Sequence, residues 1–122
     1  LGSFYFNQGI RSLFINNEHL KAKPYLEKSI EIDSNQYLSY QTLGRVYQVM
    51  SEHDNVYHNL AEVNFKKSIE LKYDEFLSHR QLGFVYFVQG GREKEAIKEF
   101  EIAISLGMKD KEVEQIIKNY KQ

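Results

Sequence analysis

Histidines and carboxylates are the side chains of this chain that first suggest acid–base or metal chemistry, because the sequence contains no cysteine. His53 and His58 lie five positions apart, which places them on different faces of a helix. We therefore do not expect them to share a metal ion. His79 falls in a run of core-type residues, and we expect a packed histidine there rather than a ligand. The sequence predicts no metal site and no cofactor.

The other candidates for chemistry also favour a structural interpretation. Glu27, Glu31, Glu99 and Glu101 lie among lysines on the same expected helices, which is typical of a solvated surface rather than of perturbed catalytic carboxylates. Gly90-Gly91 has no preceding strand and no following Lys-Ser/Thr, so it predicts a turn between helices and not a phosphate-binding loop. We expect that the chain is not an enzyme.

The elements that would position a site come from an internal repeat of two helices. The second helix of each unit carries a small residue, a large apolar one, another small one and an Ile on a single stripe. These sets are Ala22, Leu26, Ser29, Ile30, then Ala61, Phe65, Ser68, Ile69, then Ala96, Phe100, Ala103, Ile104. The two later sets are preceded by Leu43-Gly44-Arg45-Val46-Tyr47 and Leu82-Gly83-Phe84-Val85-Tyr86. A repeat of this kind predicts stacked helical hairpins.

This pattern resembles the tetratricopeptide repeat (TPR), with aromatic-x2-Leu-Gly-x2-Tyr on a first helix and Ala-x3-Phe-x2-Ala on a second. The resemblance implies an all-α solenoid of seven helices and no sheet, with TPR units over 4–35, 36–74 and 75–108 and a capping helix over 109–122. We interpret residues 1–3 as the remnant of an expression tag, and the chain as a fragment of a longer protein.

Three local features refine this prediction. In the first unit we align Phe6, Gly9, Ile10 and Leu13 with Tyr40, Leu43, Gly44 and Tyr47, because aligning Gly9 with Gly44 would place Arg11 and Ser12 in the core. Ser51–Tyr57 is an insertion that lengthens the second hairpin, with Asp54 or Asn55 as N-cap. The last helix has Asp110 as its expected N-cap and an apolar face made of Val113, Ile116, Ile117 and Tyr120.

The resemblance also implies that the first helices line a concave face that binds a peptide of another protein. The positions carried over to that face are Asn7, Arg11, Phe14, Gln41, Thr42, Arg45, Gln48, Arg80, Gln81, Phe84 and Phe87. Arginine can bind a carboxylate with two hydrogen bonds, so this set favours an acidic or C-terminal peptide. Two alternatives stay open. These residues could be ordinary surface, or the chain could be a self-assembly module that stacks through an open N-terminal edge at Phe4, Tyr5 and Phe6.

Charge and hydropathy restrict the class of partner. Sixteen basic and 17 acidic residues leave the chain nearly neutral, which disfavours nucleic acid as a partner. No apolar run is long enough to span a bilayer, so we expect no membrane insertion. The expected partner is another protein or peptide, or a second copy in a homo-oligomer.

Overall fold

Helices form all of the regular structure in residues 1–15 and 18–122, which are the residues that this computed structural model describes. The side chains of Phe14 and Ile15 also lie outside that description. The elements are α1 (Gly2–Ile10), η1 (Arg11–Ile15), α2 (His19–Ile32), α3 (Tyr37–Met50), α4 (Val56–Leu71), α5 (Phe76–Gln89), α6 (Glu93–Ser105) and α7 (Lys111–Tyr120). The predicted all-α class is confirmed. The short π-helical turn η1 is a feature that the sequence pattern did not indicate.

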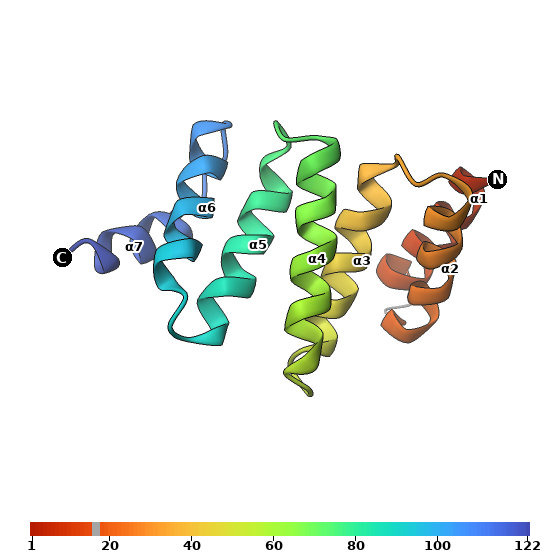
Figure 1. Ribbon diagram of the computed structural model, residues 1–122, viewed down its shortest axis with the longest axis horizontal. Coiled ribbons are helices and arrows are strands. Elements are labelled where there is room, and N and C mark those ends of the chain that lie inside the picture. The colour runs from red at the N-terminus through yellow and green to blue at the C-terminus, as the bar shows by residue number, and fades with distance from the viewer. Residues whose placement is uncertain (16–17) are drawn as a thin grey trace.

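The helices pair into three hairpins that stand side by side in a row (Figure 1). Within the hairpins α1 packs on α2, α3 on α4 and α5 on α6, and the hairpins join where α2 contacts α3 and α4 contacts α5. The two termini lie at opposite ends of the row (Figure 1). This arrangement is an all-α solenoid, in which each unit is stabilised by its neighbours.

Glycine on each first helix lets the second helix of the same unit approach closely. A Cβ added at Gly44 would lie 2.8 Å from Cε1 of Phe65, and one added at Gly83 would lie 2.5 Å from Cε1 of Phe100. In the first unit a Cβ on Gly9 would lie 2.8 Å from Cγ of Leu26. The missing side chain is therefore what makes room for the large apolar residue of each second helix.

The equivalence of Gly9 with Gly44 corrects the predicted register of the first unit, which was wrong. In the observed register Ser12 takes the place of Tyr47 and is buried, with 7% of its surface exposed. Arg11 nevertheless stays exposed and Leu13 reaches the core. The reason is η1, because a π-helical turn holds an extra residue and rotates the chain after Gly9 relative to a regular α-helix.

The repeat pattern also predicts which residues form the core, and all but one of them are buried. The exception is Ile104, which lies at the edge of the core and is only partly buried. The buried members of the prediction are Ala22, Leu26, Leu43, Gly44, Tyr47, Ala61, Phe65, Leu82, Gly83, Tyr86, Ala96 and Phe100. A histidine also belongs to this interior, since His79 is 1% exposed, as predicted for a packed side chain.

Pairs of serine hydroxyls join one hairpin to the next. Ser29 Oγ lies 2.9 Å from Ser39 Oγ, and Ser68 Oγ lies 2.8 Å from Ser78 Oγ. These four side chains are buried, so each hydroxyl needs hydrogen-bond partners within the protein. Ser29 Oγ also donates to the carbonyl oxygen of Gly2 at 3.0 Å, which places Gly2 within the first hairpin. The interpretation of residues 1–3 as a tag remnant stays a prediction.

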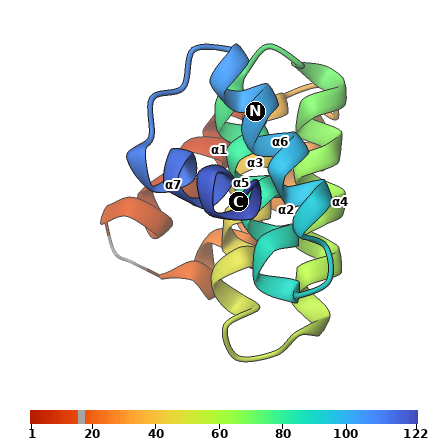
Figure 2. The same ribbon diagram turned by 90° about the vertical axis from the view of Figure 1, so that its left-hand side faces the viewer.

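The last helix lies across one end of the row (Figure 2) and packs on α6. Its N-cap is Asp110, as predicted, and the carboxylate accepts the backbone N–H of Val113 at 3.1 Å. Val113 is the buried member of its apolar face, whereas Tyr120 is 48% exposed. When Val113 of α7 is aligned with Ser78 of α5, Lys118 stands at the position of Gly83. Therefore α7 lacks the glycine that lets a second helix approach closely.

The insertion Ser51–Tyr57 leads into α4, which is the longest of the described helices, as expected for a lengthened hairpin. Asn55 is the N-cap residue, and Asp54 Oδ1 accepts the backbone N–H of Val56 at 3.1 Å. None of the described helices is both long enough and apolar enough to cross a membrane.

Candidate binding groove

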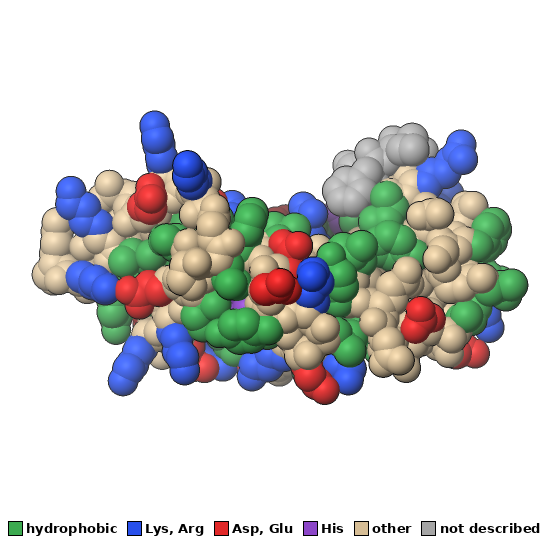
Figure 3. All heavy atoms as spheres, turned by 90° about the horizontal axis from the view of Figure 1, so that it is seen from above, with side chains coloured by type: hydrophobic (Ala, Val, Ile, Leu, Met, Phe, Trp, Pro, Cys, Tyr) green, Lys and Arg blue, Asp and Glu red, His purple; other side chains and the backbone are tan. Residues whose placement is uncertain are grey.

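A groove of about 630 Å³ opens between α3 and α5, which are the first helices of the second and third hairpins. Residues from η1, α2, α4 and the turn after α3 complete its walls. The described lining residues are Leu13, His19, Arg45, Gln48, Val49, Ser51, Glu52, His58, Gln81, Phe84 and Val88. Seen from above, the outline of the molecule is hollowed between its two ends (Figure 3).

Four of the predicted groove residues come together here. Arg45 and Gln48 lie one turn apart on α3, and Gln81 and Phe84 lie one turn apart on α5. The Phe84 ring packs edge-on against Phe100, with ring centroids 4.9 Å apart, so its position is set by the core beneath. Among the described members of the predicted set, the groove therefore has one arginine, two amides and one aromatic ring.

Other predicted residues lie outside this groove. Arg11 lines a separate depression with residues of α2, including Lys21 and Tyr25. Asn7 and Phe87 are exposed on α1 and α5 but are not among the described lining residues. The side chain of Phe14 lies outside the described residues.

Gln41 and Thr42 have structural hydrogen bonds instead. Gln41 Nε2 donates to Ser78 Oγ at 2.9 Å, which ties α3 to α5. Thr42 Oγ1 donates to the carbonyl oxygen of Leu38 at 2.7 Å within its own helix. Both side chains are buried, so neither is presented to a ligand.

Arg80 is used to attach α7. Its Nε donates to Asp110 Oδ2 at 2.8 Å, and its guanidinium lies 4.8 Å from the centroid of the Phe84 ring. Nη1 donates to Gln81 Oε1 at 3.2 Å. The hydrogen bond from Arg80 holds the pKa of the Asp110 carboxyl below its usual value. Of the three arginines predicted to converge, the structure places only Arg45 among the described lining residues of the groove.

Several lining residues were missed by the sequence prediction. Val49 and Val88 are 37% and 61% exposed, and together with Leu13 and Phe84 they give the groove an apolar surface. The helical spacing alone could have identified Val49 and Val88 in the sequence. Val49 follows Arg45 by four residues and Val88 follows Phe84 by four, so each lies on the same helix face as a predicted residue.

The charge of the groove is mixed rather than purely cationic. Among the described lining residues, Arg45 is accompanied by the carboxylate of Glu52 and by His19 and His58. Acidic and basic side chains are interspersed over the adjoining face as well (Figure 3). An apolar surface with a few polar groups around it suits a peptide that inserts side chains and is oriented by one charged contact.

Among the described residues, no group of three or more His, Cys, Asp or Glu side chains is arranged to hold a metal ion. His79 lies in the core, where Nε2 is 2.8 Å from the carbonyl oxygen of Tyr73. The absence of catalytic activity stays a prediction.

Comparison with known proteins supports the fold. No family model matches the chain, and no curated protein does. A solved structure described as "Crystal structure of MamA protein" superimposes with a TM-score of 0.74 at 26% identity, over 86% of this chain. The matched region is 54% of the MamA chain, so this chain spans about half the length of MamA. Together with the repeat pattern, this similarity fits a TPR-like solenoid.

Proposed function

We propose that the chain is a protein-interaction module that binds a segment of another protein in the groove between α3 and α5. A TPR-like solenoid supports a general protein-binding role. The observation that carries the groove proposal is the pair Val49 and Val88, two exposed apolar side chains on α3 and α5 that line the groove together with Arg45. Exposed valines in a concave site lose unfavourable contact with water when a ligand covers them.

The class of peptide follows from the polar groups. Arg45 can bind a carboxylate through two parallel hydrogen bonds, and Gln48 can bond to a peptide backbone. The ligand we propose is an acidic or C-terminal segment that also carries a large apolar side chain. Recognition of the carboxylate depends on Arg45, because it is the arginine of the predicted set that is among the described lining residues of the groove.

A peptide library with free carboxyl termini tests this proposal. We expect selected peptides to combine Asp, Glu or a terminal carboxylate with an apolar residue. Fluorescence anisotropy of such a peptide should show that Arg45→Glu weakens binding more than Arg45→Gln, because the reversed charge adds repulsion. Val88→Asp should weaken binding too, whereas Lys67→Glu on α4 should not. Selected peptides without acidic enrichment, together with unchanged affinity of Arg45→Glu, would contradict the proposal.

A second candidate function is self-assembly through the α1–α2 end of the solenoid. Phe4 is 57% exposed and its ring packs edge-on against Tyr5, with centroids 5.2 Å apart. Tyr25 of α2 is exposed as well. An aromatic surface of this kind favours association with another protein surface.

A further inference from the structure

The α1–α2 end has the form of a seat for a neighbouring hairpin. Inside the solenoid, Tyr86 of a first helix is buried against the preceding second helix, where its hydroxyl is 3.5 Å from Glu62 Oε2. Ser12 follows Gly9 by three residues, as Tyr86 follows Gly83. In the first unit, Ser12 therefore takes the place of the tyrosine, and the aromatic ring is missing there. A depression of about 480 Å³ opens there.

The charge of this depression is positive. Arg11 and Lys21 line it together with Leu20 and Tyr25, and no acidic residue is among its described lining residues. Lys21 is paired with Glu18 at 2.7 Å. Arg11 has no ion-pair partner within the part of the chain that the structure describes, so its charge is available to a second molecule.

A depression at the opposite end has charged groups of the opposite sign. Between α6 and α7 a depression of about 340 Å³ has Ile104 and Ile117 as apolar walls and Glu101 and Glu114 as its charged groups. Glu101 is paired with Lys121 at 2.7 Å. Glu114 has no ion-pair partner among the described residues, so this end presents an available carboxylate beside an apolar surface.

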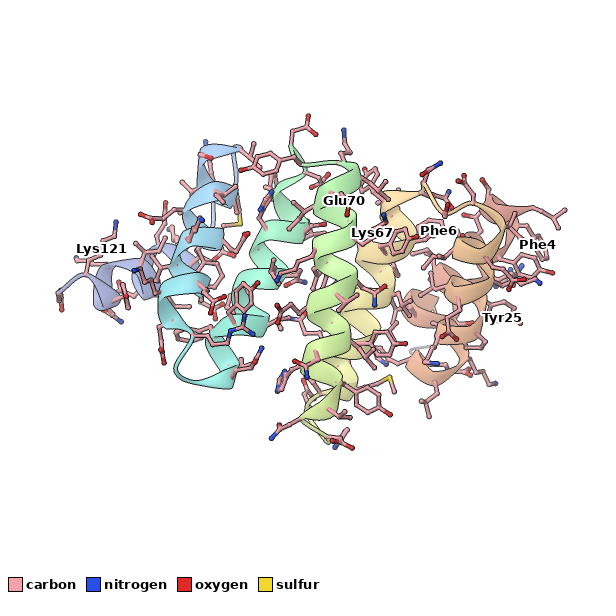
Figure 4. The ribbon with its side chains drawn as sticks, in the orientation of Figure 1. Phe4, Phe6, Tyr25, Lys67, Glu70 and Lys121 are labelled. Carbon is pink, nitrogen blue, oxygen red and sulfur yellow. The ribbon has the colours of Figure 1, made fainter. Side chains whose placement is uncertain are left out.

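We propose that the chain associates with a second copy of itself head to tail, the α1–α2 end of one copy against the α6–α7 end of the next. Phe4 and Tyr25 lie at one end of the molecule and Lys121 at the other (Figure 4), so one copy can use both surfaces at once. The contact joins Phe4 to the Ile104 and Ile117 walls and Arg11 to Glu114. A contact between two different surfaces at opposite ends produces an open chain or a ring of copies rather than a two-fold symmetric dimer.

This proposal rests on the second candidate function and is independent of the groove, since none of these end residues is among the described lining residues of the groove. Sedimentation velocity over a concentration series, at low and at high salt, measures it directly. The average mass of the wild-type chain should rise with concentration, and less so at high salt, because salt screens the exposed charges. Phe4→Ser, Arg11→Glu and Glu114→Arg should each weaken association, the two charge reversals by about three- to tenfold.

Mixing two variants identifies the geometry. Arg11→Glu and Glu114→Arg each place like charges at the junction, but an equimolar mixture restores opposite charges at every junction and should recover the wild-type rise in mass. Lys67→Glu and Glu70→Arg make the same charge changes on α4, away from both ends (Figure 4), and should leave association unchanged. A strictly monomeric wild-type chain, or a mixture that fails to recover association, would overturn the proposal. Peptide binding in the groove would be unaffected by either result.

Discussion

A Cβ placed on Gly83 would lie only 2.5 Å from Cε1 of Phe100, a residue that is completely buried. The ring cannot move away easily, because it also packs edge-on against Phe84 with centroids 4.9 Å apart. The same relationship recurs between Gly44 and Phe65, where the distance is 2.8 Å. Close approach of the two helices of a hairpin therefore depends on the absence of a side chain at this one position.

Gly83→Ala should destabilise the protein even though alanine is the better helix former. The helix propensity of alanine would contribute about 1 kcal/mol of stability, but overpacking a filled core costs about 1–3 kcal/mol. We expect a net loss, measured as a lower midpoint of urea unfolding. Gly83→Ala introduced together with Phe100→Leu should cost less than the sum of the two single changes. A Gly83→Ala variant more stable than the parent would contradict the close contact.

Phe65→Ala should cost about 3–5 kcal/mol of unfolding free energy. The side chain is completely buried between α4 and α3, so its removal leaves a cavity that the Gly44 backbone cannot fill. Because units of a solenoid contact only their neighbours, loss of the middle unit should lower the unfolding transition of the whole chain. Circular dichroism during denaturant titration measures the unfolding free energy, and Lys67→Ala on the exposed face of α4 is the matched control. A loss below about 1 kcal/mol would mean that Phe65 is not a core residue.

His79 should make stability depend on pH. Its Nε2 lies 2.8 Å from the Tyr73 carbonyl oxygen and its Nδ1 lies 3.4 Å from Glu99 Oε2, and both partners only accept hydrogen bonds. Burial of the ring lowers the pKa of His79, but the hydrogen bonds to Glu99 and to Tyr73 outweigh it and raise the pKa above 6.5. A group whose pKa is raised by folding stabilises the folded state. This stabilisation is fully present at pH values below the unfolded-state pKa, and it is lost as the pH rises through the folded-state pKa.

Unfolding free energy should therefore fall as pH rises from below 6.5 through the folded-state pKa of His79. NMR titration of the ring locates that pKa. Glu99→Gln removes the carboxylate and should lower the pKa of His79 and flatten this part of the stability profile. A His79 ring that titrates at or below the ordinary value of 6.5 would refute the charged pair.

Asp110→Ala should loosen α7 while leaving the three hairpins intact. The carboxylate caps the helix by accepting the Val113 N–H at 3.1 Å, and it accepts the Arg80 Nε–H at 2.8 Å. Loss of an N-cap side chain costs about 0.5–2 kcal/mol, which is large for a ten-residue helix that has one buried side chain. Hydrogen exchange of the α7 amides should accelerate more than that of α4. Equal protection of α7 in both proteins would show that Val113 alone holds it.

The sequence by itself determined the architecture, because the information lies within single helices. Ala61, Phe65 and Ser68 share one face by spacing alone, and three copies of that face can be buried only by stacked hairpins. The N-cap at Asp110 and the turn at Gly90-Gly91, where both glycines have positive φ, are local in the same sense. Such features depend on neighbours a few residues away, so a pattern along the chain is enough to predict them.

The tertiary structure decided which polar residues meet. Counting along the chain placed Arg11 and Arg45 at equivalent positions, but the contact of Gly9 with Leu26 shifts the first unit by one residue. The π-helical turn that follows keeps Arg11 exposed, and Arg11 lines a different depression. Arg80 is bound by Asp110, thirty residues later in the chain. Helical periodicity fixes the face of a helix on which a residue lies only while the helix is regular. The partner on the facing helix depends on how two helices are rotated and spaced, which is set by packing across the whole interface.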